Sequence, residues 1–163
     1  MDGPGIDGPS IDGPGTDGSA LAPEDELAIR NLLARYGDAV CRRDAGAWIA
    51  TWAPDCTWDL GGGRVTRGHE QTLALWRSSI AKYAWVAQLP ASGTVELVDG
   101  QARGRWYVLE LNHLADGDGV MHLGHYADTY VRTEAGWRFG VRKFHLIYRG
   151  AMEPGEVRPL EGS

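Results

Sequence analysis

The second half of the chain consists largely of long segments with alternating side chains, and this pattern constrains the fold more than any other feature. Four segments show it: residues 93–98, 101–111, 120–133 and 137–148. Asp99-Gly100 separates the first two, and such a dipeptide is typical of the tight turn in a β-hairpin. Glu134-Ala135-Gly136 separates the last two. We therefore expect two antiparallel hairpins in a single sheet.

The first half of the chain predicts helices. Pro23 and three acidic residues suit a first helical turn, where the helix dipole favours negative charge. The first helix then carries an apolar stripe with helical spacing: Ile29, Leu32, Leu33, Tyr36 and Val40. A second helix is predicted from about Ala45 to Ala53 and a third from Gly68 to about Tyr83. Residues 56–60 and 64–67 predict a short hairpin between them. Helices followed by antiparallel strands predict an α+β domain in which a curved sheet wraps around the helices.

The chain divides into three parts by composition. Residues 2–18 repeat a unit beginning Asp-Gly-Pro, which has almost nothing to bury, so we interpret residues 1–22 as a disordered acidic leader. A calcium-binding repeat is the alternative, but such repeats need more copies and more carboxylates. Residues 23–150 are the expected domain, and residues 151–163 are the expected flexible tail.

Charge and cysteine content favour some classes of protein over others. The formal charge is −6. Four of the negative charges lie in the leader, so the rest of the chain is near −2 and lacks the basic stripe typical of nucleic-acid binding. We expect no nucleic-acid partner, and no segment is apolar enough to predict a membrane span. Two cysteines without a CxxC motif, and no secretory signal, predict a cytoplasmic protein with reduced thiols.

Several short segments carry a resemblance to a known family. They are Arg35-Tyr36, Asp44 to Trp48, Trp52 to Trp58, Gly104-Arg105-Trp106-Tyr107, Tyr126-Ala127-Asp128 and Gly136-Trp137-Arg138. Over about residues 24 to 150 the chain resembles the nuclear transport factor 2-like superfamily and, within it, the SnoaL-like cone-fold proteins. The resemblance implies an open cone with an apolar interior and polar groups at its base. This superfamily hosts dehydratases, isomerases and cyclases, so the fold alone does not fix the activity.

The resemblance also implies site residues. Several members remove a proton next to an activated carbon with an Asp–His pair, assisted by tyrosines. By position, the helix tyrosine of the bile acid dehydratases falls on Tyr36, their aspartate on Cys41 and their histidine near Gln88. A later carboxylate falls near Glu110, and an arginine of the last strand falls near Leu146. The usual pair is therefore missing. Homodimerisation through the outer sheet face is a further implication, and neither a cofactor nor a metal is expected.

Glu110 is the first candidate for proton transfer. Strand alternation places it on the same side as Trp106 and Val108. If that side faces the interior of the cone, Glu110 is a carboxyl in an apolar wall, an arrangement suited to acid–base chemistry near neutral pH. The alternative is a solvated position at the mouth.

Asp128 is the second candidate, and Tyr126 and Tyr130 share its face. It lies across a predicted hairpin from Arg138 or Arg142, so a cross-strand ion pair that fixes the register is one reading. In the other reading Asp128 is the base, and Tyr126 or Tyr36 donates to a developing oxyanion. Plain core packing is the more common use of a tyrosine in a helical apolar stripe, and it is the alternative for Tyr36.

The remaining polar residues give weaker signals. His122 and His125 are three apart, so a regular strand would send them to opposite sides and no shared metal site is predicted. Cys41 is better suited to a small buried position than to a nucleophile, since nothing near it in sequence would lower its pKa. Trp58, with Trp106, fits the wall of a cavity for an organic ligand.

The resulting hypothesis is an enzyme that acts by acid–base proton transfer on a small, apolar, ring-containing molecule, as a dehydratase, isomerase or polyketide-type cyclase. The expected catalytic residues are Glu110, Asp128 and Tyr36. The expected substrate-binding residues are Gln88, Trp106, Tyr126, Cys41, Trp58 and Leu146. The alternative is a module of the same fold that binds a small ligand or assembles with a partner without catalysis.

Overall fold

The computed structural model describes residues 20–153, which form three helices and six strands in one sheet. The helices are α1 (Pro23–Cys41), α2 (Ala45–Ile49) and α3 (Gly68–Ile80). The strands are β1 (Trp52–Asp59), β2 (Val65–Arg67), β3 (Tyr83–Val98), β4 (Gln101–Leu114), β5 (Gly119–Thr133) and β6 (Gly136–Met152). The predicted α+β class is confirmed.

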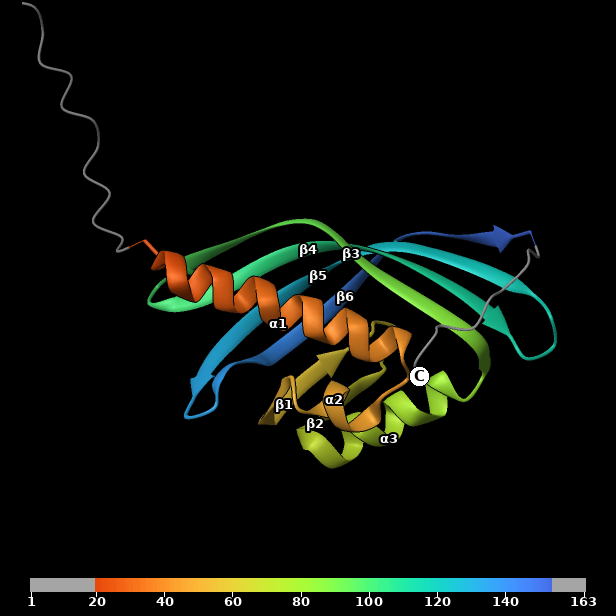
Figure 1. Cartoon of the computed structure of the whole chain (residues 1–163), viewed down its shortest axis with the longest axis horizontal. Coiled ribbons are helices and arrows are strands. Elements are labelled where there is room, and N and C mark those ends of the chain that lie inside the picture. Colours follow the sequence, from red (N-terminus) through yellow and green to blue (C-terminus); the bar gives the residue numbers. More distant parts are fainter. Residues whose placement is uncertain (1–19, 154–163) are drawn as a thin grey trace, which may run out of the picture.

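The sheet curves around the helices. Its strand order is β2-β1-β6-β5-β4-β3, and every neighbouring pair is antiparallel except β1 and β6. Figure 1 shows α1 crossing the four long strands, with α2, α3, β1 and β2 gathered near its C-terminal half. The result is a hollow with the long strands on one side and the short elements across from them.

Both predicted hairpins are present. Val98 pairs with Gln101 across Asp99-Gly100, and both turn residues have positive φ, 51° and 75°. This is the backbone conformation of the mirror-image turn that Asp-Gly favours, because glycine adopts it without strain. Thr133 pairs with Gly136 in the last hairpin.

Two predicted helix ends are wrong. The second helix ends at Ile49 instead of Ala53, and Trp52 already pairs with Phe139 of β6. The third helix ends at Ile80, and β3 begins at Tyr83. In both places the apolar residues past the helix find their partners in the sheet, and tertiary pairing overrides the helical spacing.

Strand β3 is also ten residues longer than predicted, since it starts at Tyr83 instead of Gly93. The added part contains Pro90, which cannot donate a ladder hydrogen bond. β3 is an edge strand with a bulge between Pro90 and Gly93, and edges and bulges are the positions that tolerate proline. Gly93 is needed there because a Cβ atom would overlap the Trp106 ring.

The core at the closed end of the hollow is aromatic. Trp48 packs against the rings of Tyr36, Trp52, Trp58 and Trp76 at centroid distances of 5.0–5.7 Å. All of these rings are buried. They hold α1, α2, α3 and β1 together and form the floor on which the site is built.

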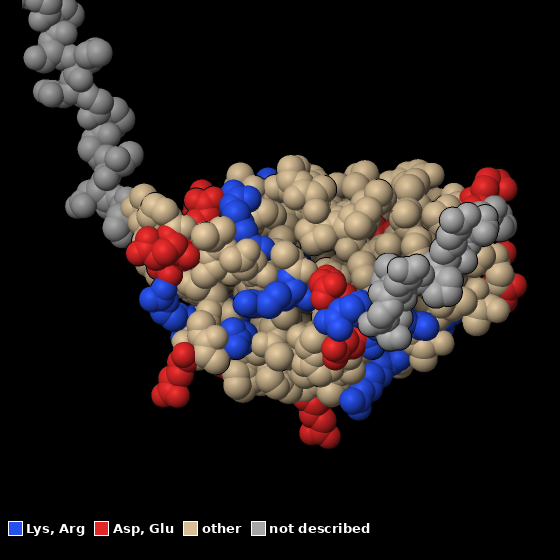
Figure 2. Space-filling model, in the orientation of Figure 1, with Lys and Arg blue, Asp and Glu red and all other residues tan. Residues whose placement is uncertain are grey.

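The predicted leader and tail are described by the structure only in part. The expected leader lies outside the described residues except for Ala20–Ala22, and the expected tail does so beyond Glu153. β6 extends into the expected tail as far as Met152. None of the helices in the described part is long and apolar enough to cross a membrane. Figure 2 shows acidic and basic residues interspersed on the face in view.

The predicted homodimer stays a prediction. The outer face of the sheet exposes several large apolar side chains that a second copy would cover. They are Leu89, Tyr107, Leu123, Val141 and Tyr148.

Candidate active site

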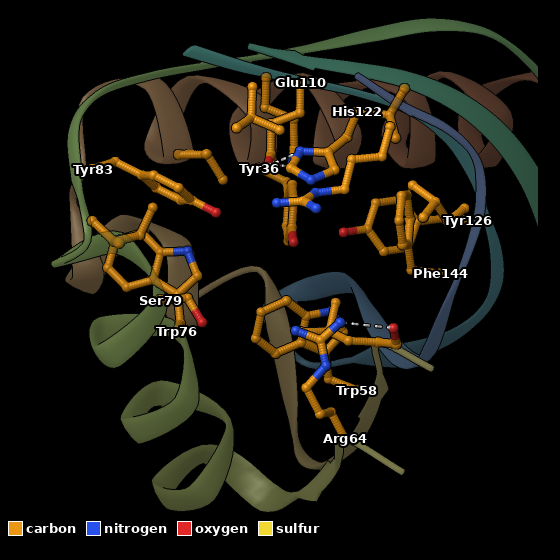
Figure 3. Close-up of a pocket in the computed structure, with 18 of the residues that line it drawn as sticks. Tyr36, Trp58, Arg64, Trp76, Ser79, Tyr83, Glu110, His122, Tyr126 and Phe144 are labelled. Carbon is orange, nitrogen blue, oxygen red and sulfur yellow. Dashed lines mark hydrogen bonds and ion pairs between the residues drawn. The ribbon is translucent and has the colours of Figure 1, made fainter. Parts of the chain in front are cut away.

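A cavity of about 450 Å³ lies between the curved strands and the short elements. Trp58, Leu60, Trp76, Ile80 and Phe144 are among its apolar lining. Polar groups also reach it: Tyr36, Arg64, Ser79, Tyr83, Gln88, Glu110, His122, Tyr126 and Arg149. Figure 3 shows Glu110 and His122 on one wall and Trp58 and Arg64 on the wall opposite. The cavity size suits a small organic molecule.

Four of the polar residues form one row across the sheet. The pairing register places Gln88 of β3 beside Glu110 of β4, Glu110 beside His122 of β5, and His122 beside Arg149 of β6. Directly paired residues project from the same side of a sheet. We call Gln88, Glu110, His122 and Arg149 the polar row. Hairpin register therefore gathers a carboxylate, an imidazole and a guanidinium from three strands.

Two amides hold the Glu110 carboxylate in place. Gln88 Nε2 donates to Glu110 Oε2 at 2.6 Å, and Asn112 Nδ2 donates to Glu110 Oε1 at 2.9 Å. The Glu110 side chain is 24% exposed, so it is neither sealed in the core nor surrounded by solvent. A carboxylate fixed by two donors and still accessible from a cavity is able to accept a proton from a bound molecule.

Asn112 also sets the protonation of His122. Asn112 is fully buried, and its Nδ2 lies 3.1 Å from His122 Nδ1 as well as beside Glu110. Because a carboxylate accepts hydrogen bonds, Asn112 must turn its NH₂ group toward it, and the second N–H then points at His122. His122 Nδ1 is thus an acceptor, and the proton of the neutral ring lies on Nε2.

The electrostatics agree with a neutral His122. Partial burial lowers the pKa of His122 below its ordinary value, and the Glu110 charge acts in the opposite direction. The positive charges of Arg149 and Arg64 lower the pKa of His122 further. At neutral pH the ring therefore offers an uncharged N–H donor.

Three tyrosines complete the polar lining. Burial raises the pKa values of Tyr36 and Tyr126 above the ordinary value, although the nearby Arg142 charge acts in the opposite direction. Partial burial and the Glu110 charge raise the pKa of Tyr83. All three hydroxyls therefore stay protonated and able to donate. Figure 3 shows the Tyr83 and Tyr126 hydroxyls pointing into the cavity from opposite sides.

Asp128 does not line the cavity. Its side chain is fully buried, and Oδ1 lies 3.2 Å from Arg142 Nε in the register that pairs the two residues. The Tyr130 hydroxyl donates to Asp128 Oδ2 at 3.1 Å. The guanidinium of Arg142 lies over the rings of Tyr36, Tyr126 and Phe139 at 3.8–4.2 Å. Asp128 therefore forms the cross-strand ion pair that the sequence also allowed. We do not assign it a catalytic role.

Trp106 and Cys41 are also absent from the lining. The Trp106 indole donates to the Tyr130 hydroxyl at 2.7 Å, which directs Trp106 into the closed end. Cys41 accepts from the main-chain N–H of Gln88 at 3.3 Å and lies behind β3. Both support the site from outside the cavity and are poorly placed to touch a ligand.

The other expected residues do line the cavity: Glu110, Tyr36, Gln88, Tyr126, Trp58 and Leu146. Sequence reasoning missed His122, Arg149, Arg64 and Tyr83. A signal for His122 was present, because Asp116-Gly117 is a turn dipeptide. A two-residue turn there would place His122 opposite Leu111. The turn of the structure is longer by one residue, with the Leu114 N–H donating to the Asp118 oxygen, and it places His122 opposite Glu110.

Comparison with known proteins decides the family. A family model described as a SnoaL-like domain matches residues 22–143. The chain belongs to the SnoaL-like domain family. The recognised family and the nuclear transport factor 2-like cone predicted from it are thereby confirmed. No curated protein matches the chain.

Solved structures similar to this SnoaL-like protein include a candidate aromatic ring hydroxylase from Novosphingobium aromaticivorans, with 26% identity and a TM-score of 0.76. That match covers 81% of this chain and 96% of the other. A hexachlorocyclohexane dehydrochlorinase from Novosphingobium barchaimii matches with 20% identity, a TM-score of 0.73 and coverage of 82% and 94%. A candidate scytalone dehydratase from N. aromaticivorans matches with 15% identity, a TM-score of 0.72 and coverage of 84% and 93%. The names of two of these similarly folded structures refer to elimination reactions.

Proposed function

We propose that this protein is an enzyme that moves a proton on a small, apolar, ring-containing molecule, as a dehydratase, isomerase or polyketide-type cyclase. The observation that carries the proposal is the polar row. It presents the Glu110 carboxylate beside a neutral His122 on the wall of a cavity with aromatic and aliphatic side chains in its lining. A base next to a hydrogen-bond donor is the arrangement that proton abstraction beside a carbonyl needs.

The geometry supports a division of roles. With a ring between Trp58 and the sheet wall, Glu110 takes a proton from the carbon next to a carbonyl. The bonding electron pair moves to the carbonyl oxygen, and His122 Nε2–H or the Tyr83 hydroxyl donates to the resulting enolate oxygen. Return of the proton to another carbon gives an isomer. Loss of hydroxide from the neighbouring carbon, with the proton supplied by Glu110, gives an alkene and water.

Two features of the chain support this division of roles. Gln88 and Asn112 orient Glu110, so the carboxylate does not need to reorganise when it takes the proton. Trp58, Trp76 and Phe144 supply apolar walls, which strengthen each hydrogen bond inside the cavity by excluding water. The dehydratase and dehydrochlorinase names of two similar structures accord with an elimination, while their low identity shows the fold alone.

The test follows proton transfer directly. A panel of cyclic ketones such as 1-tetralone and 2-tetralone is incubated with the protein in D₂O, and deuterium uptake next to the carbonyl is followed by NMR. We expect exchange above the rate without protein. Glu110→Gln is expected to reduce it by about 10²–10⁴-fold, the usual contribution of a positioned base.

Glu96→Gln is the matched control, because Glu96 is an exposed carboxylate of β3 that does not line the cavity. It is expected to exchange at the wild-type rate. Equal rates for wild type and Glu110→Gln would remove Glu110 from the mechanism.

The alternative is a binding module of the same fold. The family's usual Asp–His pair falls on Cys41 and Gln88 in this chain, which favours that alternative. A ketone that binds, as shown by calorimetry, and is recovered without deuterium would support the module over the enzyme.

A further inference from the structure

Two arginines reach the cavity from different elements. Arg149 ends the polar row on β6, next to His122. Arg64 lies just before β2, and Figure 3 shows it beside Trp58 on the wall that faces Glu110 and His122. Both residues are exposed and both line this cavity, so its solvent-facing side carries two positive charges.

Neither charge is neutralised within the described part of the chain. No ion pair there includes Arg149 or Arg64. Within residues 20–153, Arg149 makes no side-chain hydrogen bond, and the one made by Arg64 runs to the main-chain oxygen of Leu60 at 3.3 Å. Glu110 is the carboxylate of the lining, and its two oxygens already hold Gln88 and Asn112. The cavity thus has two guanidinium groups with donors to spare.

The field of these arginines extends across the cavity. The charges of Arg149 and Arg64 both act to lower the pKa values of His122 on β5 and of Tyr83 at the start of β3. An anion bound between the arginines would lie close to the Glu110–His122 pair. A planar guanidinium is well matched to a carboxylate, since it donates two parallel hydrogen bonds to the two oxygens.

We propose that the natural ligand of the cavity is a ring compound that carries a carboxylate, and that Arg149 and Arg64 bind this group. The proposal rests on the proposed function only for the claim that the ligand is also the substrate. Binding itself requires no turnover. Arg149 and Arg64 are therefore specificity-determining residues, and an uncharged ring of the same size is the weaker ligand.

The experiment compares two probes with the same ring system and nearly the same size, one of which carries a negative charge. Binding of 2-naphthoate and of 2-naphthamide is measured by isothermal titration calorimetry at pH 7 and low salt. We expect 2-naphthoate to bind about tenfold or more tightly than 2-naphthamide, the usual effect of a charge-assisted hydrogen bond. Arg149→Gln and Arg64→Gln are each expected to remove about tenfold of naphthoate affinity and to leave naphthamide affinity unchanged.

Two further variants sharpen the outcome. Arg149→Lys keeps the charge but not the fork of donors, so it is expected to fall between wild type and Arg149→Gln. Arg35→Gln is the matched control, because Arg35 is exposed on α1, does not line the cavity and forms no ion pair among the described residues. It is expected to bind both probes as wild type does.

The proposal and the proposed function fail separately. Glu110→Gln is inactive under the proposed function, yet it is expected to bind 2-naphthoate at least as tightly as wild type, since a negative charge has been removed. Absence of naphthoate binding, or equal affinity for the two probes, would overturn the carboxylate proposal whatever the deuterium exchange shows. Unchanged naphthoate affinity in Arg149→Gln and Arg64→Gln would do the same.

Discussion

Strands β5 and β6 carry two pairs of polar residues that face the same interior and behave differently. Asp128 and Arg142 are paired at the closed end, with their side chains 0% and 3% exposed. His122 and Arg149 are paired at the open end, where His122 is 21% exposed and Arg149 reaches the cavity mouth. Both pairs follow from the register of the same hairpin. The register alone therefore does not tell which pair has a structural role and which belongs to the candidate active site.

The difference lies in what surrounds each pair. At the closed end, Tyr130 donates to Asp128, and three aromatic rings cover the Arg142 guanidinium. At the open end, Arg149 has no partner in the described chain, and the N–H of His122 Nε2 is free to meet a ligand. The Arg142 guanidinium also has donors without a hydrogen-bond partner, but the rings around it shut it off from a ligand, whereas the donors of Arg149 and His122 face a cavity.

The largest expected effect comes from breaking the Asp128–Arg142 ion pair, which we call the closed pair. Arg142→Met leaves the Asp128 carboxylate buried without its cation and removes three cation–π contacts. Breaking a buried ion pair from one side costs about 3–5 kcal/mol of stability. Urea unfolding at pH 7 measures the loss. Arg149→Met is the matched control and is expected to change the free energy of unfolding by less than about 1 kcal/mol. Equal losses in the two variants would show that the two pairs do not differ in their contribution to stability.

A smaller effect is expected from pH. Burial raises the pKa of Asp128 from 3.8 to about 6, while Arg142 and the Tyr130 hydrogen bond act in the opposite direction. Since the folded pKa lies above the ordinary value, the contribution of Asp128 to stability is full below about pH 4 and is lost as the pH rises through about 6. The shift corresponds to up to about 3 kcal/mol.

Asp128→Asn removes this titration. The free energy of unfolding of the variant, relative to wild type, is therefore expected to rise by up to about 3 kcal/mol between pH 4 and pH 7. Urea unfolding across that range gives the difference, in which the other carboxylates cancel. A constant difference would mean that Arg142 keeps the carboxylate ionised throughout, so that the closed pair has no pH response.

The fold was largely predictable because its signals are local. Alternation marked the long strands, Asp99-Gly100 marked a turn, and apolar spacing marked α1. The errors arose where two periodicities coincide. Trp48, Ile49 and Trp52 suit a helix, yet Trp52 belongs to β1 because Phe139 of a distant strand pairs with it. The residues near Trp52 in the sequence cannot predict a strand partner that lies almost ninety residues away.

The site was predictable in part, for a related reason. Glu110 and Tyr126 were found because alternation places single residues on a face. The polar row required the register of three hairpins at once, and a shift of one residue in any of them changes its members. Spacing along one strand relates His122 to His125, whereas its partner in the site, Glu110, lies on the next strand. Arg64 lies in a short loop with no periodicity. Its position in the cavity lining depends on how the loop packs in the folded protein, which the local sequence does not predict.

The smallest expected effect concerns the stability of the polar row. His122→Gln offers a side-chain carbonyl that accepts the Asn112 N–H in place of the ring nitrogen, and the position is open enough for water to fill the remaining space. The free energy of unfolding is expected to fall by less than about 1 kcal/mol, while proton exchange loses the contribution of a donor, about tenfold or more. Urea unfolding and the deuterium assay on the same sample measure both. A stability loss comparable to that of Arg142→Met would contradict this prediction, because it would show that His122 contributes to the fold as strongly as the buried Asp128–Arg142 pair does.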